Sequence, residues 1–393
     1  MTYREDKALV IGGSSGIGLA ISLNLASTCR SVLIVDKSVP DAPLPDNVSF
    51  AKCNLLYESP FGIQGFDDIN ILVITAGFGR IAPFETFEQK EIENVFKVNT
   101  IALTGIIRHF YPKMLNTSDF RCAVMGSIAG LISSPLISLY SASKSAVCRL
   151  TESLNIELEA SGSPCRILTV APGSIKGTRF TGAPHTDLSQ TRDLASEIIR
   201  RMYAGETLYI PDYEKTFRGV ISRYHDNPHD FGLNSYRYKL ETGRMNTTPQ
   251  LKTGYLSGTF DLFHIGHLNL LRNARRYCDC LVVGVHKDAS HKGKHTFVPF
   301  EERCEIVRSI KYVDKVILSE PEDDDIYKKG ILKYDYLFVG SDYKGSERFN
   351  RYESYFADKD VKIIYFPYTQ GTSSTQLREA LDNINNRENQ QDK

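Results

Sequence analysis

Two histidines in one glycine-containing turn are the residues best placed for chemistry in the second half of the chain. The turn is Gly258-Thr259-Phe260-Asp261-Leu262-Phe263-His264-Ile265-Gly266-His267, between an apolar stretch around Tyr255 and a helical pattern beginning at Leu268. A helix N-terminus offers N–H groups without intrahelical partners and a partial positive charge, so this position suits a phosphate group. A capping turn with surface histidines is the plainer explanation. We favour a phosphate site because the glycines, the aspartate and both histidines occur together.

The first half carries a second set of reactive residues. Tyr140 and Lys144 are spaced by one helical turn, which places the ammonium beside the phenol and should lower the pKa of Tyr140. Ser127 follows a predicted strand and could donate to a substrate carbonyl, while Asn99 could hold a water that connects Lys144 to solvent. A helix surface pair would explain Tyr140 and Lys144 alone. With Ser127 and a glycine-rich turn upstream, the pattern favours a site for carbonyl chemistry.

That glycine-rich turn is Gly12-Gly13-Ser14-Ser15-Gly16-Ile17-Gly18. It follows the apolar run Ala8–Ile11 and precedes an amphipathic helix expected from Leu19 to about Ser27, which is the context of a dinucleotide-binding fingerprint. Asp36 ends the next predicted strand, where a carboxylate accepts hydrogen bonds from ribose hydroxyls and disfavours a 2′-phosphate. NAD is therefore favoured, although Lys37 beside it leaves NADP possible.

The composition excludes several classes of protein. The chain has 393 residues, with 47 Lys+Arg and 47 Asp+Glu, so its net charge gives no case for binding nucleic acid or a membrane surface. No apolar run approaches the roughly 20 residues that span a bilayer. The polar residues 1–7 lead directly into a strand, so we expect no signal peptide. The eight cysteines lack metal-ligand spacing and are expected to be buried reduced thiols of a cytoplasmic protein.

Alternating strands and helices must position these residues. The pattern predicts an α/β fold with two doubly wound parallel-sheet (Rossmann-like) domains in tandem, residues 1–248 and 249–393, the second with a polar C-terminal tail. One helix and an irregular tail are expected between the last strand of the first domain and the linker. The further strands are expected at Ser31–Val35, Ile71–Thr75, Cys122–Met125, Arg166–Val170, Thr207–Ile210, Cys280–Val285, Tyr336–Val339 and Lys362–Phe366.

Residues 1 to about 248 resemble a short-chain dehydrogenase/reductase. The resemblance implies a catalytic tetrad of Asn99, Ser127, Tyr140 and Lys144, with NAD(H) favoured as cofactor and NADP(H) possible. The chain departs from the family at Ile11, Thr75 and Asn54, where threonine, asparagine and aspartate are usual. The implied cofactor-binding residues are Gly12, Ser14, Ser15, Gly16, Ile17, Gly18, Asp36, Asn54, Ala76, Gly77, Tyr140, Lys144, Pro172 and Gly173.

The segment Ser174–Arg192 stands where such enzymes place a substrate loop. It carries Lys176, Arg179 and His185, which could hold a substrate phosphate through charge-assisted hydrogen bonds. A solvated loop explains the same charges equally well.

Residues 253 to about 382 resemble the glycerol-3-phosphate cytidylyltransferase branch of the nucleotidyltransferase family. The resemblance implies transfer of CMP from CTP, with Mg²⁺ on the triphosphate and no metal site made by protein ligands alone. His264, His267, Lys292 and Lys294 are the implied catalytic residues. The family has an arginine where this chain has Tyr368, and Ser341 replaces one of two aspartates. The implied CTP-binding residues are Gly258, Thr259, Phe260, His264, His267, Lys292, Lys294, Arg303, Gly340, Asp342, Gly371, Ser373, Ser374 and Thr375.

The two resemblances together imply linked reactions. A ketose phosphate would be reduced to an alditol phosphate, which would then become a CDP-alditol for surface polysaccharide. Ribulose 5-phosphate and CDP-ribitol are the first choice, and glycerol, arabinitol and mannitol phosphates remain open. Unlinked substrates, or a first domain that only senses the cofactor, are alternatives. Both families imply a homodimer or larger assembly.

Overall fold

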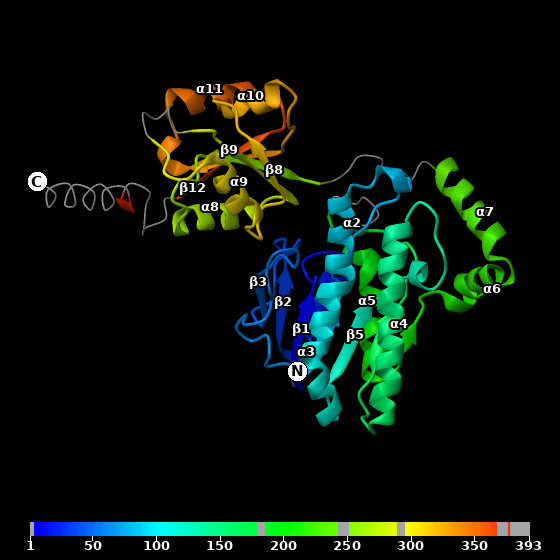
Figure 1. Ribbon diagram of the computed structural model, residues 1–393. Helices are drawn as coiled ribbons and strands as arrows, with labels where there is room; N and C mark the ends of the chain where they lie inside the picture. The colour runs from blue at the N-terminus through cyan, green and yellow to red at the C-terminus, as the bar shows by residue number, and fades with distance from the viewer. Residues whose placement is uncertain (1–3, 179–184, 243–250, 289–294, 368–375, 378–393) are drawn as a thin grey trace, which may run out of the picture. The chain divides into compact units, whose positions relative to one another are not determined.

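The chain forms two compact α/β units, Met1–Pro249 and Gln250–Lys393 (Figure 1). The computed structural model describes residues 4–178, 185–242, 251–288, 295–367 and 376–377. Each unit has its own sheet, and all the pairings between neighbouring strands are parallel. The predicted fold class, two doubly wound parallel sheets in tandem, is confirmed.

The N-terminal unit is built on a seven-stranded sheet in the order β3-β2-β1-β4-β5-β6-β7. Alternate residues of the strands face opposite layers, so Leu9 and Ile11 pack on α3 and α4 whereas Ala8 and Val10 pack on α1 and α5. Figure 1 shows α3 and α4 in front of the sheet and α5 behind it. The strands are β1 (Arg4–Ile11), β2 (Cys29–Asp36), β3 (Val48–Lys52), β4 (Ile71–Ile74), β5 (Arg121–Met125), β6 (Ile167–Val170) and β7 (Leu208–Tyr209), and the covering helices are α1 (Gly16–Ala26), α2 (Gln89–Phe96), α3 (Leu103–Asn116), α4 (Ser138–Ala160) and α5 (Leu188–Tyr203).

The first helix differs from its prediction. It begins at Gly16, inside the glycine-rich turn, and most of its residues are buried. It is covered by the sheet on one side and by α5 on the other, so an apolar surface nearly all round replaces the expected amphipathic pattern.

The prediction of one helix and an irregular tail after β7 is wrong. The chain there forms the π-helical turn η5 (Tyr213–Phe217), then α6 (Arg218–Asp226) and α7 (Pro228–Glu241). Pro228, expected to break the chain, instead occupies the first turn of α7, where its missing N–H costs nothing. Asn227 caps the helix by accepting the Asp230 N–H at 3.1 Å. We call η5, α6 and α7 together the arm.

The C-terminal unit has a five-stranded sheet in the order β10-β9-β8-β11-β12. One face packs on α8 and α9 and the other on α10 and α11. The strands are β8 (Thr253–Gly258), β9 (Cys280–Val285), β10 (Lys315–Leu318), β11 (Tyr336–Gly340) and β12 (Lys362–Phe366), and the helices are α8 (Ile265–Arg275), α9 (Phe300–Arg308), α10 (Asp323–Lys328) and α11 (Glu347–Phe356).

Both sheets have a point where the strand order reverses, between β1 and β4 in the first and between β8 and β11 in the second. Ligands of open parallel sheets bind at the carboxyl ends of the strands at this point. The glycine-rich turn follows β1, and the two-histidine turn follows β8. The topology therefore places each turn at the expected ligand-binding edge of its own sheet.

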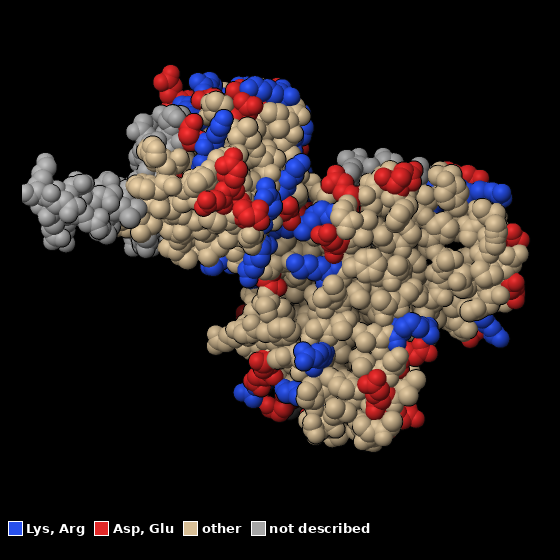
Figure 2. All heavy atoms as spheres, viewed as in Figure 1, with Lys and Arg blue, Asp and Glu red and all other residues tan. Residues whose placement is uncertain are grey.

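Charges of both signs are interspersed on the visible face of each unit, as Figure 2 shows. This distribution gives no single-sign surface on that face for a polyanion. Among the described residues, no helix combines the length and the apolar character needed to cross a membrane.

Candidate active sites of the two units

Close backbone packing shapes the glycine-rich turn. Gly12 has a φ of 86°, and a Cβ there would lie 2.5 Å from the backbone nitrogen of Ala76. A Cβ at Gly18 would lie 2.2 Å from the Gly12 carbonyl oxygen, so only glycine fits either position. Thr75, which replaces the usual asparagine, donates its hydroxyl to the Gly12 carbonyl at 2.9 Å. This hydroxyl gives the turn a side-chain support after β4.

Asp36 is tied to the same turn. Its carboxylate accepts the Ser14 N–H at 3.1 Å and the Ser38 N–H at 3.0 Å. The Ser14 hydroxyl is fully buried and has no hydrogen-bond partner among the described residues. An unsatisfied buried hydroxyl is costly, so it indicates a place for a polar ligand.

The segment after β6 reaches the start of α1. Thr186 accepts the Gly16 N–H at 2.6 Å through its hydroxyl oxygen, and the same hydroxyl donates to Asp41 at 2.9 Å. The Gly16 N–H is one of the helix N-terminal donors that suit an anion. Sequence reasoning missed this contact because Gly16 and Thr186 are 170 residues apart.

Ser127, Tyr140 and Lys144 come together after β5 and along the first turns of α4. Burial raises the pKa of Tyr140 to about 12, while its hydrogen bond with Ser127 acts in the opposite direction. The Lys144 ammonium lies 5.8 Å from the Tyr140 ring centroid and donates to the Met125 carbonyl at 2.6 Å. Burial lowers the pKa of Lys144 to about 8. The expected lowering of the Tyr140 pKa by Lys144 is therefore wrong for this structure, because desolvation outweighs the cation.

Asn99 supports this cluster through its side-chain amide. The amide accepts the Phe78 N–H at 3.0 Å and donates to the Phe78 carbonyl at 2.8 Å and to Ser143 at 3.0 Å. These bonds engage the side chain with protein groups, whereas the sequence suggested a water. Asn99 lies in the π-helical segment Lys97–Ala102, which is a geometry often found at functional sites.

Two glycines give the catalytic side chains their space. A Cβ at Gly77 would lie 3.2 Å from the Lys144 ammonium nitrogen, and one at Gly79 would lie 2.7 Å from the Tyr140 ring. Gly77 was among the predicted site residues, whereas Gly79 was not. Its signal in the sequence was the repeated glycine around Phe78.

The remaining predicted cofactor residues lie along the same edge. Ser15 caps α1 in extended conformation, and Ile17 is half-buried in its first turn. Pro172 follows β6, and its carbonyl accepts a long hydrogen bond of 3.5 Å from Ser127. Asn54 differs from its predicted role: its side chain accepts the Leu56 N–H at 3.1 Å and so closes a turn after β3.

The arm contacts both sides of the Ser127 and Tyr140 cluster. The Phe217 ring rests on Gly173, where a Cβ would lie only 2.5 Å from it. Lys239 of α7 donates to the Ser134 hydroxyl and to the Pro135 carbonyl, each at 2.7 Å. Ser134 and Pro135 belong to the loop that joins Ser127 to α4. Sequence reasoning missed both arm residues because it expected an irregular tail.

The two histidines of the second unit cap α8. His264 accepts the Gly266 N–H through Nδ1 at 3.1 Å, and His267 accepts the His264 N–H through Nδ1 at 3.4 Å. Burial lowers the pKa of His264. Phe260 and Leu262, in the same turn, have φ values of 54° and 49°, a left-handed conformation that costs about 1–3 kcal/mol per non-glycine residue.

Asp261 and Arg303 hold this turn from within. The buried Asp261 carboxylate accepts the N–H groups of Phe297 at 3.1 Å and Val298 at 3.0 Å. Arg303 is 1% exposed, and its guanidinium donates to four backbone carbonyls, those of Thr259, His286, Lys287 and Val298. Arg303 was predicted to contact phosphate. The structure instead commits its donors to the backbone around the turn.

Other predicted nucleotide-binding residues surround the carboxyl ends of β8 and β11. Gly258 ends β8, and the Thr259 hydroxyl is buried without a partner among the described residues. Gly340 ends β11, and a Cβ there would lie 2.4 Å from a carboxylate oxygen of the exposed Asp342. Lys176 and His185 of the first unit are exposed. The remaining predictions, at Arg179, Lys292, Lys294, Tyr368, Gly371, Ser373, Ser374 and Thr375, fall outside the described residues.

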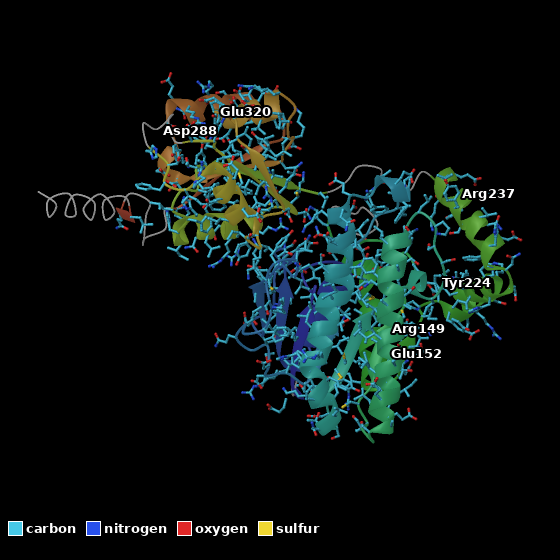
Figure 3. All side chains as sticks on the ribbon, viewed as in Figure 1. Arg149, Glu152, Tyr224, Arg237, Asp288 and Glu320 are labelled. Atoms are coloured by element: carbon cyan, nitrogen blue, oxygen red, sulfur yellow. The ribbon has the colours of Figure 1, made fainter. Side chains whose placement is uncertain are left out.

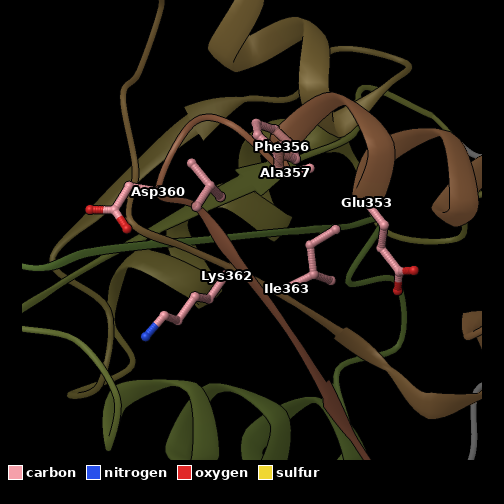
Figure 4. Close-up of a pocket in the computed structure, with 7 residues that line it drawn as sticks. Glu353, Phe356, Ala357, Asp360, Lys362 and Ile363 are labelled. Atoms are coloured by element: carbon pink, nitrogen blue, oxygen red, sulfur yellow. The ribbon is translucent and has the colours of Figure 1, made fainter.

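A hollow beside α11 lies elsewhere in the second unit (Figure 4). It is lined by residues that include Glu353 and Phe356 of α11 and Lys362 at the start of β12. The start of a parallel strand is the edge opposite to the two-histidine turn, so this hollow is separate from the candidate nucleotide site.

Comparisons with known proteins agree with the division into two units. Residues 61–188 match the family model for short chain dehydrogenase, and residues 255–380 match the cytidylyltransferase-like model. Over 129 residues the chain is 33% identical to glycerol-3-phosphate cytidylyltransferase of Staphylococcus aureus, covering 32% of this chain and 90% of that protein. An uncharacterized oxidoreductase of Escherichia coli is 29% identical over 187 residues, which are 45% of this chain and 68% of that protein. A short chain dehydrogenase/reductase from Burkholderia phymatum, solved in complex with NAD, has a TM-score of 0.48 and 18% identity, covering 64% of this chain and 99% of that one.

Proposed function

We propose a function from the premise that this chain belongs to the short-chain dehydrogenases over its N-terminal unit and to the cytidylyltransferases over its C-terminal unit. The first unit reduces a ketose phosphate to an alditol phosphate. The second transfers CMP from CTP to that phosphate and releases pyrophosphate. The observation that carries the proposal is the presence of a Ser127-Tyr140-Lys144 cluster and a two-histidine helix cap in one chain.

The residues of the first unit fit a nicotinamide dinucleotide, NAD(H) in preference to NADP(H). The buried Ser14 hydroxyl has room for a ligand bond, and the start of α1 suits a pyrophosphate. Asp36 stands at the end of β2, where it would accept bonds from the adenosine ribose and repel a 2′-phosphate. When bound, the reduced cofactor supplies the hydride that reduces the ketone carbon.

The protein then has to supply a proton to the ketone oxygen. With its pKa at about 12, Tyr140 is protonated at neutral pH and can donate its hydroxyl proton. Ser127, bonded to the same hydroxyl, is placed to donate to the substrate oxygen as well. Lys144 keeps a positive charge next to the phenolate that forms, provided that the pH is below about 8.

In the second unit, the oxygen of the alditol phosphate attacks the α-phosphorus of CTP. The bond from that phosphorus to the bridging oxygen breaks, and pyrophosphate leaves. The nucleophile is already an anion, so positioning and charge neutralisation provide most of the catalysis. His264 and His267 would donate to the α-phosphate. Lys292 and Lys294 would bind the other phosphates, and Mg²⁺ would accompany CTP.

The first choice of substrate is ribulose 5-phosphate, which gives ribitol 5-phosphate and then CDP-ribitol for capsule or teichoic-acid-type polysaccharide. A glycerol phosphate acceptor is the main alternative, because the S. aureus relative is named for it. Glycerol 3-phosphate is common in cells, however, and would hardly need a fused reductase. Arabinitol and mannitol phosphates come next.

The test is a single incubation of the full chain with ribulose 5-phosphate, CTP, Mg²⁺ and either NADH or NADPH. Mass spectrometry should detect CDP-ribitol, and omission of the reduced cofactor should abolish it. Ribitol 5-phosphate added with CTP alone should restore the product. Failure to form any CDP-alditol from a panel of ketose phosphates would refute the linked function.

A further inference from the structure

The arm closes part of the reductase site but has little packing of its own. None of the residues in η5, α6 or α7, all within the described part of the chain, is buried. Helices of this length gain most of their stability from tertiary contacts. Two of those contacts are made to the walls of the site, by Phe217 to Gly173 and by Lys239 to Ser134 and Pro135. The arm thus connects the turn after β6 with the loop between Ser127 and Tyr140.

Lys239 is an unusual residue for such a contact. Its ammonium is half-buried and bonded only to a hydroxyl and a carbonyl, and no carboxylate pairs with it within the described parts of the chain. Burial lowers its pKa to about 8. A partly desolvated cation without a counter-charge is costly, and an anionic ligand would offset that cost.

Anchoring the loop does not by itself explain the charge. The loop is already held on its other side, because the Ala82 N–H donates to the Leu136 carbonyl at 2.7 Å. A neutral side chain could supply the bonds to Ser134 and Pro135 at a lower desolvation cost. The other cations considered for substrate binding, Lys176 and His185, are exposed. Lys239 is therefore the better-prepared cation on a wall of this site.

We propose that Lys239 binds the phosphate group of the sugar whose ketone is reduced at Tyr140, and so makes the reductase specific for phosphorylated substrates. This inference rests on the proposed function of the first unit. The phosphate would take hydrogen bonds from the Lys239 ammonium and from the Ser134 hydroxyl, both of which lie on the loop side of the site. Lys239 would then act in substrate binding and not in the proton transfer.

The test compares Lys239→Gln, Lys239→Arg and Arg237→Met with the unmodified chain. Glutamine keeps a hydrogen-bond donor for the loop but removes the charge, and arginine restores the charge. Arg237 lies on the same helix and is exposed (Figure 3), so its loss controls for a general change of charge. KM and kcat are measured with ribulose 5-phosphate and with unphosphorylated ribulose, together with inhibition by inorganic phosphate.

Lys239→Gln should raise KM for ribulose 5-phosphate by roughly 10- to 100-fold, the loss expected for a charge-assisted phosphate contact. Its kcat, its KM for ribulose and its KM for the cofactor should stay within about twofold, and inhibition by inorganic phosphate should be lost. Lys239→Arg should recover most of the affinity. Equal losses with both ketoses, or no loss with either, would reduce Lys239 to a loop anchor and overturn the inference. If the unmodified chain reduces no ketose phosphate, the proposed function itself fails.

Discussion

The imidazole rings of His264 and His267 lie 4.0 Å apart, centroid to centroid, with 30° between their planes. Each ring accepts a backbone N–H through Nδ1. A neutral imidazole that accepts at Nδ1 carries its proton on Nε2, so both rings are fixed as Nε2–H donors. Burial lowers the pKa of His264, which favours this neutral form. The helix cap thus sets the tautomer that a phosphate oxygen requires.

Replacement of His264 by asparagine separates capping from catalysis. Asparagine can cap α8 in place of Nδ1 but has no atom at the position of Nε2. We expect the rate of cytidylyl transfer to fall roughly 100- to 1000-fold, as for the loss of one preorganised donor. The free energy of unfolding should change by less than about 0.5 kcal/mol, whereas His264→Ala should also lose about 1 kcal/mol of capping. Unchanged transfer by His264→Asn would show that Nε2 has no part in the reaction.

Replacement of Tyr140 by phenylalanine should affect one activity only. Without the hydroxyl there is no proton donor at the ketone, so reduction should fall roughly 100- to 10 000-fold. Cytidylyl transfer, measured as pyrophosphate release with added alditol phosphate, should be unchanged. Tyr111→Phe is the matched control, because the Tyr111 hydroxyl makes only a long 3.4 Å bond to the exposed Glu157. Loss of both activities in Tyr140→Phe would point to a defect in folding.

Reduction should also depend on the charge of Lys144. Its pKa is lowered to about 8 by burial, so its ammonium loses the proton as the pH rises through that value. With the pKa of Tyr140 at about 12, the phenol stays protonated across the same range. We therefore expect kcat/KM for reduction to be level below pH 8 and to decline above it. Cytidylyl transfer of the same sample monitors the integrity of the second unit, and a decline beginning only near pH 10.5 would contradict the low pKa of Lys144.

Local patterns were sufficient to predict where the strands end, and contacts distant in sequence were not. Gly12, Ser127 and His264 each follow an apolar strand, so short-range periodicity predicts their place at the carboxyl edge of a sheet. Nothing local shows that Thr186 bonds to Gly16 or that Phe217 covers Gly173. These contacts depend on how the segments after β6 and β7 return over the sheet edge.

The Tyr140 and Arg303 expectations failed for a related reason. Sequence spacing indicates that Lys144 is near Tyr140 but not how deeply both are buried, and burial determines the direction of the pKa change. Similarly, a basic residue in a nucleotide-binding motif is expected to face the ligand. Only the three-dimensional course of the chain reveals the carbonyls that occupy the guanidinium of Arg303.

Cofactor preference can be tested at Asp36. Asp36→Ser removes the carboxylate that would repel a 2′-phosphate, while a hydroxyl can still accept a hydrogen bond from the turn. The ratio of kcat/KM for NADH to that for NADPH should fall by roughly tenfold or more, the size of one lost charge contact. Lys37→Met, at the neighbouring exposed position, is the control and should change the ratio little. A larger effect at Lys37 than at Asp36 would indicate that the enzyme uses NADPH.

Arg303 should be required for the shape of the nucleotide site without touching the nucleotide. Arg303→Met would leave the carbonyls of Thr259, His286 and Val298 without their buried donor, and each such group costs about 1–3 kcal/mol. After partial relaxation we expect a loss of about 2–4 kcal/mol in unfolding free energy of the second unit. Arg308→Met is the matched control on the same helix, because its pair with Glu305 is exposed and is worth less than about 1 kcal/mol. Chemical denaturation followed by a probe in the second unit, with CTP titrated by calorimetry at low temperature, measures both effects. If Arg303→Met binds CTP weakly but unfolds like the unmodified chain, Arg303 is a phosphate ligand after all; a large loss of stability shared with weaker binding identifies it as the support of the two-histidine turn.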